Sequence, residues 1–558
     1  MNSQQTSRVA ARPEPAIEVV AAAEIARFVD LIERRRRGEV DEEDFRRFRL
    51  QHGVYSIRGQ TDVQMVRVKI PCGALTAAQL ECLGAIAETF SRGIGHITTR
   101  QDVQFHWVPL DGVPQVLRRL LEVGLTTREA CGNIARNVTA CPLAGVCATE
   151  AFDVTPYASA LSRHLLRNPV CQALPRKFKI AFSGCATDCA VTGIHDIGAL
   201  ATIREEDGAT RRGFRLYVGG GLGPAPQAAQ LLEPFTPAED LILTAVAIVR
   251  VFDRLGNRQN RARARMKFLV KDLGIEEFRR LVFEERRVLW SAWAGGPPPV
   301  PTASEPAPPP ATGVPLPKGP TPAGFEVWRK TNVVPQKQAG FYAAYVTVPG
   351  GDLTADQFRA LAALIRRFPG VEPRTVRTQN LALRWVREEW LPGVYAALVE
   401  AGLGRPGVHG IADVVGCPGA DTCNLAITYS HRLALELSHQ LTQNTDLALA
   451  EDLKGVTIKV SGCPNSCGQH HIATIGLYGA ARKVGDRQVP FYQLLLGGQA
   501  YDGQVTFAQP VIRIPARRVP EAIFRLVETY RSERAEGESF LDWIKRKEVG
   551  DGDTDETF

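Results

Sequence analysis

The amino-acid sequence predicts an α/β (α+β) fold made of two pseudo-symmetric halves. Three observations support this prediction. Segments of the first half recur in the same order in the second half, each half alternates strand-like and helix-like segments, and a proline-rich stretch lies between them. The chain of 558 residues, with 44% hydrophobic and 23% charged residues, has ordinary globular composition. This excludes a wholly disordered chain, a collagen-like rod and a small disulfide scaffold.

The repeat is visible in two pairs of segments. Residues 65–76 (MVRVKIPCGALT) correspond to 343–354 (AAYVTVPGGDLT), and residues 98–107 (TTRQDVQFHW) correspond to 376–385 (VRTQNLALRW). Matching segments that keep their order over such lengths indicate duplication rather than chance.

Periodicity predicts the elements of the first half in turn. Residues 64–70 alternate apolar and polar side chains as a half-buried strand does, and residues 77–90 carry apolar positions at helical spacing. Residues 103–108 are expected to form a further strand and residues 114–123 a further helix.

The boundary between the halves is a linker. Between Pro297 and Pro322 the sequence has twelve prolines and almost no large apolar residues. Such a stretch is expected to be extended or disordered.

Charge and cysteine content limit the functional classes. The net charge of +7 is a mild excess without the concentrated basic face that nucleic-acid binding needs, so it suits an acidic protein partner or an anionic substrate. No stretch approaches the ~20 apolar residues that span a bilayer, and no secretory signal is recognised. We therefore expect a cytoplasmic protein that binds neither membrane nor nucleic acid. In that compartment the twelve cysteines favour metal ligation over disulfides.

Four cysteines of the second half form a metal-binding pattern. Cys417 and Cys423 are separated by five residues, and Cys463 and Cys467 are separated by three. Four thiolates suit a [4Fe–4S] cluster, which needs one soft anionic ligand for each iron. A structural zinc site with four cysteine ligands and a set of scattered core thiols are the alternatives, although zinc sites favour shorter spacings than that of the first pair.

With these motifs, and with TTRQ at 98–101 and LPRKFK at 174–179, the chain resembles the nitrite/sulfite reductase family that contains sirohaem and a [4Fe–4S] cluster, of the ferredoxin-dependent assimilatory type. The resemblance covers nearly all of residues 50–535. It implies two sirohaem-reductase halves built from ferredoxin-like and sirohaem-domain units. The expected division is a helical N-terminal extension (1–50), a first ferredoxin-like half-domain (51–125), a first sirohaem/Fe–S domain (126–295), the linker (296–322), a second ferredoxin-like half-domain (323–404), a second sirohaem/[4Fe–4S] domain (405–535) and a C-terminal tail (536–558).

The resemblance also implies roles for individual residues. Cys417, Cys423, Cys463 and Cys467 would hold the cluster, and Cys467 would also ligate the sirohaem iron. Basic residues would bind the anionic substrate; the matching positions are Arg67, Arg136, Lys177 and Lys179. Other matches lie near the macrocycle: Arg100, Gln101, Gln104, Arg261 and Lys267.

The implied reaction is the six-electron reduction of sulfite to sulfide, and reduction of nitrite to ammonia by the same machinery is the alternative. Lys179 favours sulfite, because sulfite-reducing members tend to have lysine there and nitrite-reducing members asparagine. The run Gly219–Gly223 lacks the spacing of a dinucleotide-binding loop, so a ferredoxin or similar acidic protein is the expected donor. A non-enzymatic iron–sulfur electron-transfer subunit is the rival hypothesis.

The first half has a cysteine quartet of its own, which departs from the assimilatory pattern. Cys141, Cys147, Cys185 and Cys189 repeat both spacings of the second half. They predict a second cluster, with vestigial thiols as the alternative. The positions that would supply cations to a second active site are uncharged: Tyr345, Ala412, Gly455 and Thr457. A second cluster would therefore act as an electron relay or lie beside a silent haem.

Three histidines near these motifs are interpreted as structural. His106 is expected to be a satisfied core histidine rather than a ligand. His470 and His471 follow Cys467 closely, and we expect them to support the site from a second layer or to lie on the surface.

Overall fold

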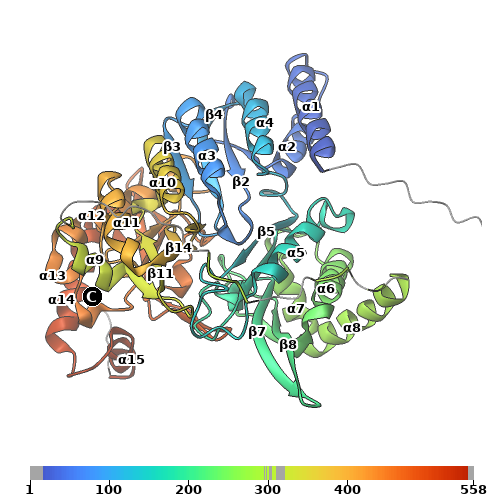
Figure 1. Ribbon diagram of the computed structural model, residues 1–558. Helices are drawn as coiled ribbons and strands as arrows, with labels where there is room; N and C mark the ends of the chain where they lie inside the picture. The colour runs from blue at the N-terminus through green and yellow to red at the C-terminus, as the bar shows by residue number, and fades with distance from the viewer. Residues whose placement is uncertain (1–16, 294–295, 297, 301–304, 310–320, 551–558) are drawn as a thin grey trace, which may run out of the picture.

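The computed structural model describes residues 17–293, 296, 298–300, 305–309 and 321–550. In these ranges each half contains a small unit and a large unit, each built on one main sheet, and a fifth, two-stranded sheet belongs to the second large unit (Figure 1). The sheets of the small and large units are called the small and large sheets. The predicted duplication is therefore present in the architecture, and the fold is the predicted mixture of helices and sheets.

Two helices precede the first sheet: α1 (Ile17–Arg36) and α2 (Glu42–Gln51). Asp41 caps α2 by accepting hydrogen bonds from the N–H groups of Glu43 and Asp44. Phe28 of α1 and Phe45 of α2 are buried against the first small sheet, which explains why this extension is helical and ordered.

The first small sheet has the strand order β1-β2-β4-β3-β12. Its first-half elements are β1 (Val54–Ser56), β2 (Val63–Val68), α3 (Ala77–Phe90), β3 (Ile94–Ile97), β4 (Val103–Pro109) and α4 (Val113–Glu122). The predicted strands and helices at 64–70, 77–90, 103–108 and 114–123 are confirmed by β2, α3, β4 and α4. A capping box fixes the start of α3, since the side chains of Thr76 and Gln79 each accept a hydrogen bond from the other's N–H.

The second small sheet has the order β10-β11-β14-β13. Its half contributes α9 (Phe325–Asn332), β10 (Val333–Pro335), β11 (Phe341–Val346), β12 (Asp352–Thr354), α10 (Ala355–Arg367), β13 (Glu372–Thr375), β14 (Leu381–Arg387) and α11 (Leu391–Glu400). Helix α10 begins with the same capping box, formed by Thr354 and Gln357. Its packing against α3 is visible in Figure 1, where a yellow helix lies beside a blue one.

Each half forms backbone pairing with the edge of the other half's sheet. Strand β12 of the second half pairs with β3 of the first, with Asp352 opposite His96. The reciprocal contact is a bridge between Ala74 and Arg374. One hydrophobic core runs through both small sheets and joins Phe105 and Leu83 to Phe358 and Leu383. The small units of the two halves therefore form a single packed body.

The first large sheet has the order β5-β6-β7-β8-β9, in which β5, β6 and β7 are parallel and the rest antiparallel. Its elements are β5 (Ala135–Ala140), α5 (Thr155–Leu165), β6 (Phe178–Ser183), β7 (Ile197–Glu206), β8 (Ala209–Val218), β9 (Gln230–Pro237), α6 (Leu241–Leu255), α7 (Met266–Leu273) and α8 (Ile275–Ala292).

The second large sheet, β15-β16-β17-β18-β21, repeats this pattern of parallel and antiparallel pairs. Its elements are β15 (Val415–Gly416), α12 (Ser430–Gln443), α13 (Thr445–Ala448), β16 (Ile458–Ser461), β17 (Ile475–Val484), β18 (Arg487–Leu496), the hairpin β19 (Gln499–Tyr501) and β20 (Gln504–Thr506), β21 (Gln509–Pro515), α14 (Val519–Glu533) and α15 (Phe540–Gly550).

The end of the described chain differs from the expected tail. Helix α15 lies within 536–558, and its residues Phe540, Trp543 and Ile544 are buried. Trp543 makes an edge contact with Tyr530 of α14, so this stretch is part of the second large unit. Most of the expected linker, and residues 1–16 and 551–558, lie outside the described residues.

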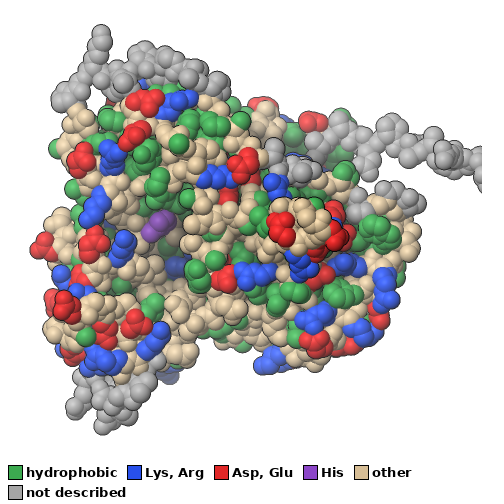
Figure 2. Space-filling view, turned by 60° about the horizontal axis from the view of Figure 1, so that its bottom comes forward, with side chains coloured by type: hydrophobic (Ala, Val, Ile, Leu, Met, Phe, Trp, Pro, Cys, Tyr) green, Lys and Arg blue, Asp and Glu red, His purple; other side chains and the backbone are tan. Residues whose placement is uncertain are grey.

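The surface carries mixed charge. Figure 2 shows acidic and basic side chains interspersed over one face of the molecule. Among the described residues, no helix combines the length and the apolar composition that a membrane span requires.

Candidate functional site

The second-half cysteines lie at the carboxyl ends of two adjacent parallel strands. Cys417 follows β15, and Cys463 and Cys467 follow β16. The Cys417 N–H donates to the Val460 carbonyl, which extends the pairing of the strands to the first cysteine. Parallel strands thus bring together two motifs that lie about forty residues apart in the sequence.

The four cysteines lie on two loops that are hydrogen-bonded to each other, since the Ile427 and Thr428 N–H groups donate to the Gly462 carbonyl. Burial raises the pKa of Cys417 to about 12, and the charge of Cys467 adds to this rise. Burial also raises the pKa values of Cys423 and Cys463, again with Cys467 contributing. The charge of Cys467 therefore acts on the other three cysteines of the group.

The surroundings suit thiolate sulfur. The N–H of Gly462 donates to the Cys417 sulfur at 3.2 Å, and the Asn465 side-chain amide donates to the Cys463 sulfur at 3.4 Å. At Gly462 a Cβ atom would lie 2.9 Å from the Thr428 carbonyl oxygen, so only glycine lets the loop close this tightly. The site therefore fits a cluster held by four thiolates with donated hydrogen bonds.

A group of half-buried cations comes under the influence of Cys467. Burial lowers the pKa of Lys177 to about 8, and the charge of Cys467 opposes the shift. Burial also lowers the pKa of Lys179 well below its usual range, helped by Arg100 and Lys177 and again opposed by Cys467. The same charge acts on the Arg67 guanidinium. Three cations from the first half are therefore electrostatically linked to a cysteine of the second.

Hydrogen bonds hold two residues of this group in place. Arg136 donates to the carbonyls of Ala130 and Gly132. Arg67 donates to the Ala130 carbonyl, and in its favoured orientation the Gln104 amide oxygen accepts from Arg67 as well. Backbone and amide oxygens thus fix both guanidinium groups.

A second layer of charge lies behind the lysines. Arg265 donates to Asp196 at 2.9 Å, and Asp196 also accepts from the Lys179 N–H. Nε of Arg265 and Nε of Arg100 are buried without a hydrogen-bond partner among the described residues. Unpaired buried donors of this kind are costly, and they fit an anionic group bound beside them.

Two of the predicted macrocycle residues have other partners, and a third is exposed. Gln101 donates to the Thr375 carbonyl and accepts from the Ala140 N–H. It therefore links the residue before Cys141 to the second half. Lys267 donates to the carbonyls of Gly221, Leu222 and Ala225. Arg261 is exposed. Arg265, which the sequence analysis missed, lies between these two residues in the same RARARMK run and is buried; only its burial distinguishes it.

The histidines differ from expectation. Neither ring nitrogen of His106 has a hydrogen-bond partner among the described residues, so the description of it as a satisfied core histidine is wrong. His470 and His471 are buried, and His471 hydrogen-bonds to the Gly223 carbonyl at 3.0 Å. The expected surface role of these two residues does not hold.

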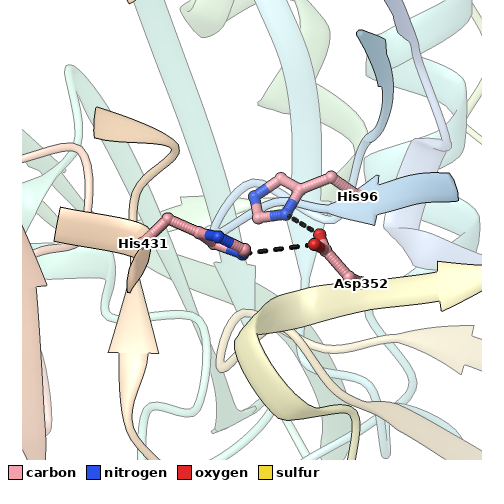
Figure 3. Close-up of side chains that lie close together, drawn as sticks. All are labelled: His96, Asp352 and His431. Atoms are coloured by element: carbon pink, nitrogen blue, oxygen red, sulfur yellow. Dashed lines mark hydrogen bonds and ion pairs between the residues drawn. The ribbon is translucent and has the colours of Figure 1, made fainter. Parts of the chain in front are cut away.

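A His–Asp–His group lies between the halves (Figure 3). His96 Nδ1 is 2.7 Å from one oxygen of Asp352, and His431 Nε2 is 3.3 Å from the other. Burial alone would raise the pKa of Asp352, but the His431 imidazole beside it and the hydrogen bond from His96 lower it well below its usual range.

These three side chains could in principle hold a metal ion, but the neighbouring amide indicates otherwise. Gln379 accepts from the Gly416 N–H, which turns its NH2 group towards Nε2 of His96 at 3.1 Å. His96 Nε2 must then accept, so Nδ1 carries the proton and donates to Asp352. This is a hydrogen-bonded link between the halves, because a metal would need Nδ1 free of its proton.

Comparison with known families identifies the fold. The model described as "Nitrite and sulphite reductase 4Fe-4S domain" matches residues 131–288 and 407–549. The model described as "Nitrite/Sulfite reductase ferredoxin-like half domain" matches residues 57–123 and 334–401. The chain belongs to the nitrite and sulfite reductase family. The small units are the ferredoxin-like half domains of this family, and the large units are its 4Fe–4S domains.

Individual members of the nitrite and sulfite reductase family are similar over most of their length. A sulfite reductase [ferredoxin] of Mycobacterium tuberculosis (strain CDC 1551 / Oshkosh) is 31% identical over 87% of this chain and 83% of its own. An assimilatory ferredoxin-dependent nitrite reductase of Haloferax mediterranei is 30% identical over 90% and 86%. The structure of the Mycobacterium tuberculosis NirA protein superposes with a TM-score of 0.79 at 29% identity, covering 96% of this chain and 97% of that one.

Membership of the nitrite and sulfite reductase family makes this chain an enzyme whose cofactors are sirohaem and a [4Fe–4S] cluster. The residues present fit both groups. Four cysteines on two hydrogen-bonded loops fit the cluster, and cations with unpaired buried donors fit a macrocycle that carries carboxylates.

Proposed function

We propose that this enzyme reduces sulfite to sulfide with six electrons, at a site centred on Cys467. The observation that supports this most directly is that Arg67 and Arg136 donate to the same carbonyl, that of Ala130, while Thr99 of the same half donates to the Cys467 carbonyl. The Cys467 charge also acts on Arg67, Lys177 and Lys179. Half-buried cations gathered near one thiolate suit a small anion, since partly buried charges need compensation.

The four second-half cysteines would hold the cluster, and Cys467 would also be the ligand of the sirohaem iron. Arg100, Gln104, Arg261 and Lys267 remain the proposed contacts of the macrocycle, together with Gln101, whose side chain also holds Ala140. Arg265 joins them because its Nε lacks a partner among the described residues. When bound, sirohaem coupled to the cluster supplies an iron that ligates the substrate and accepts electrons one at a time.

The protein's own side chains would bind and protonate the anion. Arg67 and Arg136 offer planar donor groups whose positions are fixed by the Ala130 carbonyl. Lys177 and Lys179 can donate a proton as well as a charge, and their lowered pKa values make them better acids than an exposed lysine.

Sulfite is preferred over nitrite in this proposal because of Lys179. A doubly charged anion gains more than nitrite from an additional buried cation. Relatives named for either substrate have similar identity to this chain, so nitrite reduction by the same residues is the second candidate.

The proposed electron donor is a ferredoxin, which the printed names of several relatives include. The net charge of +7 favours an acidic partner of this kind. A reducing compartment, the cytoplasm, suits the chain because all twelve of its cysteines are free thiols.

The experiment is an anaerobic assay of the reconstituted enzyme with a reduced viologen dye, sulfite or nitrite, and quantification of sulfide, ammonia and oxidised dye. The proposal predicts one sulfide for every six one-electron dye oxidations and a higher kcat/KM for sulfite than for nitrite. A higher value for nitrite would favour the second candidate. Loading with both cofactors but turnover of neither substrate would favour the non-enzymatic electron-transfer subunit.

A further inference from the structure

The first-half cysteines lie on two adjacent loops, as those of the second half do. Cys141 follows β5, and Cys185 and Cys189 follow the adjacent parallel strand β6. The two loops are joined by a hydrogen bond from the Ala151 N–H to the Gly184 carbonyl at 2.8 Å. In the second half the Ile427 N–H donates to the Gly462 carbonyl at 2.7 Å in the same way.

The backbone around them repeats the arrangement at the second-half cluster site. The Cys141 N–H donates to the Phe182 carbonyl, as the Cys417 N–H donates to that of Val460. The Ala140 N–H donates to Gln101, as the Gly416 N–H donates to Gln379. The loop therefore has the same backbone supports as the loop that carries Cys417.

The outer side of the first-half loop is also fixed. The Gly145 N–H donates to buried Glu150, which lies 3.2 Å from the Lys337 ammonium. Gln338 donates to the Gly145 carbonyl at 3.0 Å. The second half thereby holds the first-half loop in a defined conformation, as a preorganised metal site requires.

Two basic side chains lie beside this quartet. Arg377 is half-buried and donates to the Cys189 carbonyl at 3.1 Å. Lys459 is buried, and burial and the charge of Arg377 lower its pKa well below its usual range. Alignment with the first-half cations had shown only uncharged positions there, Tyr345, Ala412, Gly455 and Thr457, and it did not reveal these two residues. The Arg377 charge suits the negative charge of a cluster with four thiolates.

One side chain connects the two centres. Arg377 Nη1 donates to the side-chain oxygen of Gln469 at 3.0 Å, two residues beyond Cys467. Thr99, the first-half counterpart of Arg377, donates to the Cys467 carbonyl at 2.9 Å. A short bonded route therefore runs from Cys189 through Arg377 to the loop that carries Cys467.

We propose that Cys141, Cys147, Cys185 and Cys189 hold a second [4Fe–4S] cluster and that it relays electrons to the Cys467 centre. The relay rests on the proposed function, whereas the cluster does not. Each electron accepted from the protein donor leaves for the Cys467 centre, so the second cluster returns to its starting state and six such transfers accompany each sulfite.

The test counts metal in the anaerobically purified, fully reconstituted full-length enzyme. Wild type is expected to hold about nine irons and eight acid-labile sulfides, whereas Cys185→Ser/Cys189→Ser should hold about five and four. The control Cys82→Ser/Cys171→Ser changes two cysteines outside both quartets and should match wild type.

The wild-type count decides the matter even if the double variant fails to fold. About five irons in wild type would overturn the cluster. So would an unchanged iron count in the folded variant, or zinc that is present in wild type and absent from the variant.

The relay is tested separately with two reductants. In the double variant, turnover driven by reduced [2Fe–2S] ferredoxin should fall more than turnover driven by the viologen dye. Equal effects on both would overturn the relay. Nine irons in an enzyme that reduces neither sulfite nor nitrite would overturn the proposed function and leave the second cluster supported.

Discussion

At the scale of single residues, the balance between sulfite and nitrite depends on the cations around Cys467. Lys179 is half-buried, its backbone N–H donates to Asp196, and the charges of Arg100, Lys177 and Cys467 act on its ammonium. Solvent compensates a charge in this position only in part, so its removal should change which anion is preferred.

Lys179→Asn is expected to shift the preference towards nitrite. Loss of one charged hydrogen bond costs about 1.5–3 kcal/mol, which corresponds to about a 10- to 100-fold fall in the sulfite-to-nitrite ratio of kcat/KM. Steady-state assays of both substrates measure this ratio. Lys177→Asn removes the same charge from the neighbouring position; an equal shift in that variant would show that total charge, not Lys179, sets the preference.

Two glutamines at equivalent positions form hydrogen bonds to both halves of the molecule. Gln379 of the second half accepts from the Gly416 N–H beside Cys417 and donates to the Ile97 carbonyl of the first half. Gln101 of the first half does the same towards Ala140 and Thr375. Each cluster loop is thus fixed by a contact that spans both halves.

Gln379→Leu is expected to loosen the second-half cluster. Unpaired buried backbone groups cost about 1–3 kcal/mol, so iron release to a chelator should accelerate by about 5- to 100-fold. The matched control is Gln493→Leu, because Gln493 is a buried glutamine whose amide likewise makes two donated contacts, to the carbonyls of Leu494 and Ile512. If both variants release iron at the same rate, the hydrogen bonds of Gln379 have no specific role in holding the cluster.

At the scale of elements, the N-terminal helices depend on a buried histidine. His52 follows α2, packs against Phe28 and Phe48, and hydrogen-bonds to the Phe48 carbonyl. Burial, and then the charge of Arg128, lower its pKa to about 4. In this pH range the folded state, with α1 and α2 packed, binds fewer protons than the unfolded state. The packing of these helices therefore loses stability as the pH falls from about 6.5 towards 4.

His52→Gln is expected to remove this pH dependence. Between pH 7.5 and 5 the wild-type free energy of local opening should fall by about 2 kcal/mol, since the unfolded imidazole takes up the proton. Glutamine can keep the hydrogen bonds without titrating. Hydrogen exchange of α1 and α2, corrected for its intrinsic pH dependence, measures the effect, and an equal pH dependence in the two proteins would refute it.

Local periodicity predicts the elements whose partners are close in sequence. The helix predicted at 77–90 coincides with α3, because its apolar spacing and its capping residues Thr76 and Gln79 all lie within the segment or next to it. The exchange of β12 onto β3 could not be predicted, since Asp352 and His96 pair across more than 250 residues. Buried Arg265 and Arg377 were missed for the same reason, because only the assembled sheets bury them.

At the scale of the whole molecule, the duplication is visible in the backbone as well as the sequence. Residues at equivalent positions share unusual positive φ angles: Cys72 and Gly350 at 55° and 64°, Trp107 and Trp385 at 66° and 62°. The side chains at the two centres differ, however. Cations from the first half converge on Cys467 of the second, whereas the positions that would do the same at Cys189 are uncharged.

The central claim is that the Cys467 thiolate serves both cofactors of the catalytic site, and Cys467→Ser tests it most directly. We predict that this variant loses the sirohaem absorption bands and sulfite turnover with the viologen dye. Cys189→Ser changes the equivalent first-half residue and should retain both. A Cys467→Ser enzyme with a normal sirohaem spectrum and full turnover would contradict the claim.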